Sequence, residues 1–272
     1  NPVYEDIATK FFEHFLYIAA AMKDLGGREI DLWDDEDQFF YDVLHTGDGA
    51  ARPLKVRSMV GLIPLFAVEI LDASLLARVP EFAARLQWFL DYRPDLADLV
   101  SRWHQPGKED RRLLSLLRGH RMKSVLARLL DESEFLSEHG VRALSRIHRD
   151  HPFAIEAGGR TFSVDYQPGE SDSGLFGGNS NWRGPVWFPV NFLLIEALRR
   201  FSAYYGDDLT VECPVGSGTM LPLAAAADEL ARRLVSLFLP DARGRRPVFG
   251  AAEKLQSEPH FRDHLLFFEY FH

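Results

Sequence analysis

The chain has 272 residues, of which 46% are hydrophobic and 26% are charged, and this balance is typical of a globular protein with one substantial core. A formal net charge of -9 argues against a nucleic-acid-binding protein, in which clustered Lys and Arg side chains contact phosphates. The single cysteine, Cys213, cannot form an internal disulfide and therefore favours a cytoplasmic location. No apolar run approaches the roughly 20 residues of a membrane-spanning helix, so we expect no membrane partner.

The two ends of the sequence predict a piece of a longer protein. The chain starts at Asn1 without a Met or a signal pattern, and it stops on the apolar-aromatic run 265–272. No Pro-, Gly- or Ser-rich linker divides the residues between, so we expect one domain over 1–272. The sequence leaves the oligomeric state open.

Apolar residues recur at helical spacing along most of the chain. Two windows show this best, with the stripes Ile7, Phe11, Phe15, Ala19, Met22 and Leu223, Ala227, Leu230, Leu234, Leu237. Further helices are expected over 59–71, 75–90, 111–136 and 185–204. The sequence therefore predicts an all-α fold.

Short extended segments interrupt this pattern. We expect strands at 38–43 and 161–166, the second preceded by a Gly158-Gly159 turn, and we interpret both as β-hairpins on loops. The range 150–184 has no helical period and is longer than most loops of compact domains, which indicates a functional loop.

The segment from Asn181 to Trp187 (Asn-Trp-Arg-Gly-Pro-Val-Trp) concentrates side chains that suit a sugar. Sugar C–H faces pack on indole rings, while amide and guanidinium groups hydrogen-bond to hydroxyls. The alternative is that Trp182 and Trp187 only anchor the loop on the core. We expect Asn181, Trp182, Arg183 and Trp187 to bind the substrate.

Four stretches resemble glycoside hydrolase family 63, the family of mannosyl-oligosaccharide glucosidases and their bacterial relatives. They are 32–42 (LWDDEDQFFYD), 140–145 (GVRALS), 181–191 (NWRGPVWFPVN) and 267–272 (FFEYFH). The resemblance implies an (α/α)6 barrel with the sugar site among its loops, of which this chain would be the C-terminal portion. It also implies an oligosaccharide or small-glycoside substrate and no cofactor.

The resemblance also implies a mechanism. Similar proteins hydrolyse α-glucosidic bonds with inversion, using one carboxylic acid and one carboxylate base. Their base motif falls on Glu269, which we expect to be partly desolvated among aromatic neighbours, with Tyr270 in the sugar pocket. Their acid is an Asp that would lie upstream of Asn1, so we expect these residues alone to be inactive. Asp34, Asp37, Glu170 and Asp172 are weaker candidates for the acid.

The remaining sequence features are weaker indications of function. Trp33 and Arg57 lie in stretches that look like the family, so either is a secondary candidate for contacting the substrate. His260 and His264 have the i, i+4 spacing of metal ligands, but no zinc motif is completed, and they are interpreted, like His148 and His151, as surface or packing residues. The acidic run 34–37 lacks the glycine of a calcium loop and is interpreted as a solvated turn. We therefore predict no metal.

Other functions stay open. An α-mannosidase, a trehalase-like enzyme or a glycosyl-glycerate hydrolase would fit the same residues, and so would a helical toroid that binds sugar without cleaving it. An acidic residue upstream of Asn1 would distinguish the enzymes from the non-catalytic alternative.

Overall fold

The computed structural model of the protein describes residues 2–24, 31–47, 49–100, 105–117, 119–167 and 186–271. Its internal contacts divide the chain into two compact units. Unit 1 comprises Asn1–Lys55, Val60–Leu126 and Arg199–Thr210, and unit 2 comprises Val56–Met59, Ala127–Leu198 and Val211–His272. Two such units can belong to one domain, so the single domain over 1–272 stays a prediction.

Unit 1 combines helices with short paired strands. Its helices are α1 (Pro2–Lys23), α2 (Ile63–Phe66), α3 (Ala73–Arg78), α4 (Pro80–Tyr92), α5 (Pro94–Val100) and α6 (Gly119–Leu129), the last of which runs on into unit 2. Its strand pairs are β1 (Trp33–Asp34) with β2 (Phe39–Phe40), β3 (Asp42–His45) with β4 (Ala51–Leu54), and β5 (Val68–Leu71) with β6 (Arg112–Ser115).

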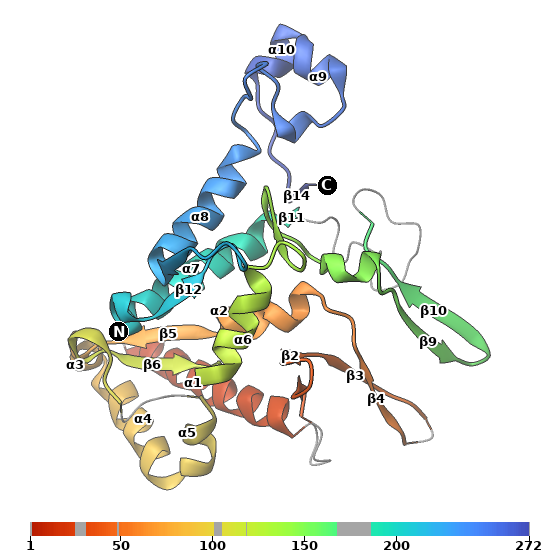
Figure 1. Ribbon diagram of the computed structural model, residues 1–272. Coiled ribbons are helices and arrows are strands. Elements are labelled where there is room, and N and C mark those ends of the chain that lie inside the picture. The colour runs from red at the N-terminus through yellow and green to blue at the C-terminus, as the bar shows by residue number, and fades with distance from the viewer. Residues whose placement is uncertain are drawn as a thin grey trace. The chain divides into compact units, whose positions relative to one another are not determined.

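The helical core of unit 1 forms where α1 packs against α4 and α5 (Figure 1). Phe12 lies edge-on to Phe82 and Phe89, with ring centroids 6.0 and 5.7 Å apart. The predicted inward stripe of α1 is partly wrong, because Ile7 is 41% and Phe11 is 70% exposed. The helix is apolar on two faces, and the face with Phe12, Leu16 and Ala19 is the one that α4 and α5 cover.

Unit 2 has the same mixed character. Its helices are α7 (Phe188–Tyr205, which runs on into unit 1), α8 (Leu223–Ser236), α9 (Glu253–Ser257) and α10 (Pro259–Asp263). Its strand pairs are β7 (Leu136–Ser137) with β8 (Gly140–Val141), β9 (Phe153–Ala157) with β10 (Arg160–Val164), and β11 (Val186–Trp187) with β14 (Tyr270–Phe271). Strand β12 (Thr210–Glu212) pairs with β13 (Met220–Pro222).

Two predictions for unit 2 are confirmed. All five apolar residues of the predicted stripe over 223–237 are buried, and four of them lie on α8. Strands β9 and β10 pair in register around Gly158 and Gly159, whose φ angles of 58° and 72° are those that a tight hairpin turn requires. The hairpin is drawn in green in Figure 1, where β9 and β10 are labelled.

The prediction of an all-α fold, and with it the (α/α)6 barrel, is wrong. Every strand among the described residues belongs to a two-stranded sheet, and helices and small hairpins alternate along the chain. Two windows expected to be helical, 59–71 and 111–136, each contain a strand beside a helix, since 68–71 pairs antiparallel with 112–115. Short apolar runs of this length satisfy helical and extended patterns equally well, and only the tertiary pairing decides between them. The chain has a mixed α and β fold.

Candidate functional site

Strands β11 and β14 join the two most specific of the four resembling stretches. Val186 lies opposite Phe271, and Trp187 lies opposite Tyr270. The Phe188 N–H continues the pairing by donating to the Glu269 carbonyl oxygen at 2.7 Å. Directly opposite residues place their side chains on the same face, so the half-buried Trp187 and Tyr270 are neighbours on the face away from the buried Val186 and Phe271.

A buried amide ties a third stretch to this pair. The Asn191 Oδ1 accepts the Val141 N–H at 2.7 Å, and Nδ2 donates to the carbonyl oxygens of Val141 and Trp187, both at 3.0 Å. Asn191 is only 2% exposed. Arg142, which follows Val141 in the sequence, forms an antiparallel β-bridge with Val186. Asn191 therefore fixes the start of α7, strand β11 and strand β8 relative to one another.

Gly140 permits this close packing. Its φ of +122° is strained for any residue with a side chain, and a Cβ atom there would lie 2.8 Å from Leu234 and 3.0 Å from the Asn191 amide oxygen. Gly140 and Asn191 both lie within the resembling stretches, but no sequence pattern predicts a role for either. Only the three-dimensional contacts show that they hold the strands together.

Glu269 has a backbone held by hydrogen bonding and a side chain without a polar partner in the described part of the chain. Its carbonyl oxygen accepts the Phe188 N–H, whereas its carboxylate makes no hydrogen bond or ion pair with another described residue. From the sequence, aromatic neighbours are expected to desolvate the Glu269 carboxylate partly. In the described part of the chain this expectation is wrong, because Glu269 is exposed and Phe267 is itself 63% exposed. The rings of Phe188, Phe238, Phe267 and Phe271 pack on one another beside the strand pair, although Phe267 stays largely exposed.

The rest of the predicted sugar-binding segment cannot be placed. Asn181, Trp182 and Arg183 lie outside the described residues, as do Glu170 and Asp172, two of the weaker candidates for the acid. Of the predicted substrate-binding residues, Trp187 and Tyr270 are the ones that the described structure brings side by side.

A buried charge cluster supports the 140–145 stretch within unit 2. The Glu134 carboxylate accepts hydrogen bonds from Arg57, Arg128 and Ser145, each at 2.6 Å. Arg57, a secondary candidate for substrate contact, is thus one partner of a buried ion pair. This arrangement favours a structural role for Arg57.

His148 completes the cluster as a neutral imidazole. Its Nε2 accepts the Arg57 backbone N–H at 2.8 Å, so Nδ1 carries the proton and donates to the His151 carbonyl oxygen at 3.0 Å. Burial lowers the pKa of His148; the bond to His151 opposes this shift and the nearby Arg57 charge adds to it. His148 is a packing histidine, which agrees with the interpretation from the sequence.

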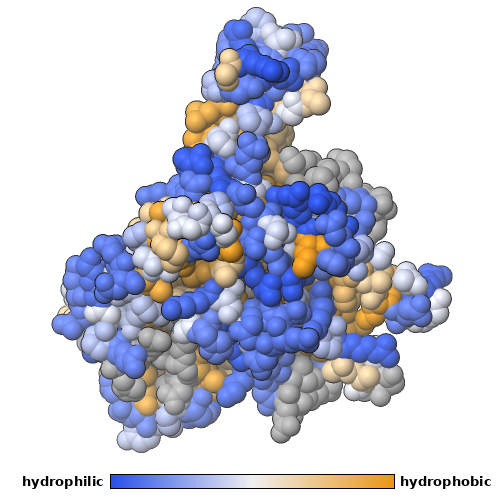
Figure 2. Space-filling view, in the orientation of Figure 1, coloured by the Kyte–Doolittle hydropathy of each residue, from blue (hydrophilic) through white to orange (hydrophobic). Residues whose placement is uncertain are grey.

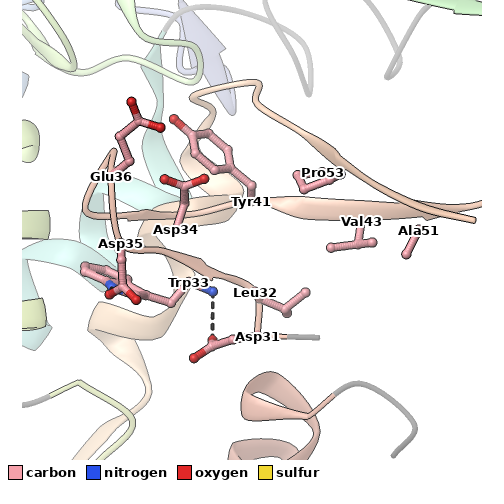
Figure 3. A pocket seen from close by; sticks show the side chains of 10 residues that line it. All are labelled: Asp31, Leu32, Trp33, Asp34, Asp35, Glu36, Tyr41, Val43, Ala51 and Pro53. Carbon is pink, nitrogen blue, oxygen red and sulfur yellow. Dashed lines mark hydrogen bonds between the residues drawn. The ribbon is translucent and has the colours of Figure 1, made fainter. Parts of the chain in front are cut away.

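Unit 1 contains a separate pocket at the acidic turn. The pocket has a volume of about 440 Å³, and Figure 3 shows acidic side chains on one side and the β3–β4 hairpin on the other. Its lining residues are Asp31, Leu32, Trp33, Asp34, Asp35, Glu36, Tyr41, Val43, Ala51 and Pro53. This volume is within the range of small-molecule sites, so the pocket is a second candidate.

The carboxylates of this turn are held by cations and N–H groups. Lys55 contacts Asp34 at 2.9 Å and Asp37 at 3.1 Å, and Arg121 contacts Asp31 at 3.1 Å. Burial tends to raise the pKa of Asp34, but hydrogen bonds from the Asp37 N–H and the Lys55 ammonium outweigh it and hold the pKa below its usual value. The turn is thus more ordered than a solvated acidic run.

Trp33 is part of the framework of this turn. It is only 4% exposed, its Nε1–H donates to Asp35 at 2.9 Å, and the Arg121 guanidinium lies 4.8 Å from its ring centroid. A sugar needs an open indole face on which to pack. Its role in substrate binding stays a prediction, and its burial favours packing.

Two further properties concern metals and membranes. No group of three or more His, Cys, Asp or Glu side chains in the described part of the chain is arranged to hold a metal ion. None of the described helices combines the length and the apolar character that crossing a membrane requires.

Comparison with known proteins shows a similarity to a yeast protein. No family model matches the chain. The chain is 48% identical, over 285 aligned positions that cover 100% of it, to the uncharacterized protein YMR196W of Saccharomyces cerevisiae. The matched region is 26% of the yeast protein, so the chain spans about a quarter of that relative.

Proposed function

We propose that this chain is part of a glycoside hydrolase that cleaves α-glucosidic or related α-mannosidic bonds with inversion. The observation that carries the proposal is the pairing of Trp187 with Tyr270 across β11 and β14. The two resembling stretches lie about 80 positions apart in the sequence, yet their aromatic residues are direct neighbours on one face. The link to family 63 remains a resemblance in sequence.

The aromatic pair would serve as the sugar platform. Both rings are half-buried, which leaves part of each accessible while the strand pairing fixes their positions. Sugar C–H groups pack on such surfaces, and the Tyr270 phenol can hydrogen-bond to a sugar hydroxyl, whereas the Trp187 indole nitrogen is itself buried. Asn191 would act as a positioning residue, because it holds the Trp187 carbonyl oxygen.

Glu269 would be the general base. Its carboxylate would take a proton from a water molecule while the water oxygen bonds to the anomeric carbon and the glycosidic C–O bond breaks. The departing oxygen needs a proton from an acid whose pKa is raised. Asp34 does not fit that role because its pKa is lowered. The acid that the resemblance implies, an Asp upstream of Asn1, stays a prediction.

Glycosyl fluorides test the base without the acid, because fluoride leaves without being protonated. The chain alone is expected to be inactive on O-glycosides, but we expect it to accelerate hydrolysis of α-glucosyl or α-mannosyl fluoride and to release the β-sugar, which proton NMR distinguishes. Glu269→Gln should lower the rate by about 10²- to 10⁴-fold, the range for removal of a general base. Glu258→Gln, which changes another exposed glutamate of unit 2, should stay within twofold.

Two outcomes would overturn the enzyme assignment: no acceleration of either fluoride, or Glu269→Gln within a few-fold of wild type. The exposure of Glu269 favours a second candidate, a sugar-binding protein without catalysis. That candidate predicts saccharide binding by the wild-type chain and no fluoride hydrolysis.

A further inference from the structure

His260 and His264 lie together at the exposed end of unit 2. His260 is on α10 and His264 directly follows the helix, and their ring centroids are 5.1 Å apart with an interplanar angle of 56°. Both side chains are exposed. The surface over α9 and α10 in Figure 2 is mainly hydrophilic, so a dissolved ion has access to this end of the molecule.

The ring separation suits one shared metal ion. Zinc binds imidazole nitrogen at about 2.0–2.1 Å, so two rings in adjacent coordination positions have centroids roughly 4.5–5.5 Å apart. The observed 5.1 Å lies within this range. The i, i+4 spacing alone did not distinguish this arrangement from two unrelated surface histidines.

Both imidazoles are available as ligands. Neither ring forms a hydrogen bond or ion pair with another described residue, and the neighbour of His260 besides His264 is the apolar ring of Phe261, with centroids 5.2 Å apart. His148 differs, since both of its ring nitrogens are engaged. The carboxylate nearest to the pair, Asp263, is already bound by Arg262 at 3.0 and 3.1 Å.

We propose that His260 and His264 form a two-ligand site for a divalent transition metal ion, with Zn²⁺, Ni²⁺ and Cu²⁺ as the matching class. Imidazole nitrogen suits these ions, whereas Ca²⁺ and Mg²⁺ require oxygen ligands. Because the described residues supply no third ligand, water or a group from another molecule completes the coordination. The site is independent of the proposed glycosidase activity.

Calorimetric titration of the chain with ZnCl₂ and NiCl₂ at pH 7.5 tests the site. We expect one ion per chain, and we expect His260→Asn and His264→Asn each to weaken its affinity at least tenfold. His14→Asn removes an exposed histidine of α1 and should leave the affinity within twofold.

Electron paramagnetic resonance of the Cu²⁺-loaded chain provides a direct readout, with two nitrogen donors expected in the wild type and one in each single variant. Circular dichroism checks that the variants fold. We expect them to fold because His260 and His264 are both exposed. The proposal is overturned if the wild type binds no more tightly than the double variant, or if His14→Asn weakens binding as much as the two substitutions in the pair.

Discussion

The acidic turn of unit 1 and the paired strands of unit 2 carry similar side chains but use them differently. At the turn, Trp33 is buried and Lys55 and Arg121 neutralise the carboxylates around it. At the strands, Trp187 is half-buried, and the Glu269 carboxylate has no partner among the described residues. Tryptophan and carboxylate therefore form a framework in one region and an accessible surface in the other.

This difference shows what identifies a binding surface. By side-chain type alone, both regions are equally suited to bind a sugar, and the presence of a pocket of about 440 Å³ favours unit 1. Accessibility of the aromatic faces reverses the order, because a buried indole with its N–H already bonded cannot contact a ligand through its ring. The predictions below test whether the two regions differ as described.

The largest expected effect concerns Asn191. Replacing it with Leu keeps the volume but removes three hydrogen bonds and leaves the Val141 N–H and C=O groups buried without a partner. We expect a loss of about 3 kcal/mol in the free energy of unfolding. Asp35→Asn in the acidic turn should cost less than about 1 kcal/mol. Urea unfolding measures both losses of stability. Equal losses would contradict the expected contrast between the buried Asn191 amide and the acidic turn.

Lys55→Met should have a smaller effect. The Lys55 side chain is 40% exposed, and its ammonium bridges Asp34 and Asp37, whose side chains are 20% and 23% exposed. Such partly exposed ion pairs contribute up to about 1 kcal/mol, so we expect a loss of that order. A loss above 3 kcal/mol in the same unfolding assay would mean that the acidic turn contributes as much to stability as the Asn191 hydrogen bonds.

The two regions should also respond to acid in different pH ranges. The pKa of His148 is lowered in the fold, so its contribution to stability is present above the unfolded value of about 6.5 and is lost as the pH falls below it. The pKa of Asp34 is also lowered in the fold, so its contribution to stability is lost as the pH falls below the unfolded value of about 3.9. Both groups favour folding in their deprotonated forms.

Urea unfolding at several pH values separates these contributions. His148→Asn should flatten the fall in stability around pH 6 and leave the change below pH 4 in place, while Lys55→Met should do the reverse. If His148→Asn left the slope around pH 6 unchanged, the neutral, buried state of His148 would be refuted.

Sequence patterns predicted those elements that depend on local chemistry. The apolar stripe of α8 and the Gly158-Gly159 hairpin are confirmed because periodicity and turn geometry are properties of neighbouring residues. The strand pairing of 68–71 with 112–115 was missed because it depends on a distant segment. On α1 both faces are apolar, so no sequence pattern could tell which one α4 would cover.

The candidate site divides in the same way. Trp187, Glu269 and Tyr270 were identified from the sequence stretches, but their pairing through β11 and β14 was not predicted. The exposure of Glu269 and the burial of Trp33 were missed too, since both depend on which elements pack nearby. Asn191 was overlooked because a buried amide has no sequence signature apart from the strands that it connects.

The most direct test of the central claim is titration of the chain with methyl α-glucoside and methyl α-mannoside, followed by saturation-transfer NMR. The account predicts that Trp187→Ala and Tyr270→Ala each weaken binding at least tenfold, about 1.4 kcal/mol, and that Trp33→Phe leaves it within twofold. Circular dichroism confirms the folding of each variant. Loss of binding in Trp33→Phe with full binding in Trp187→Ala would move the sugar site to the acidic pocket and contradict the account.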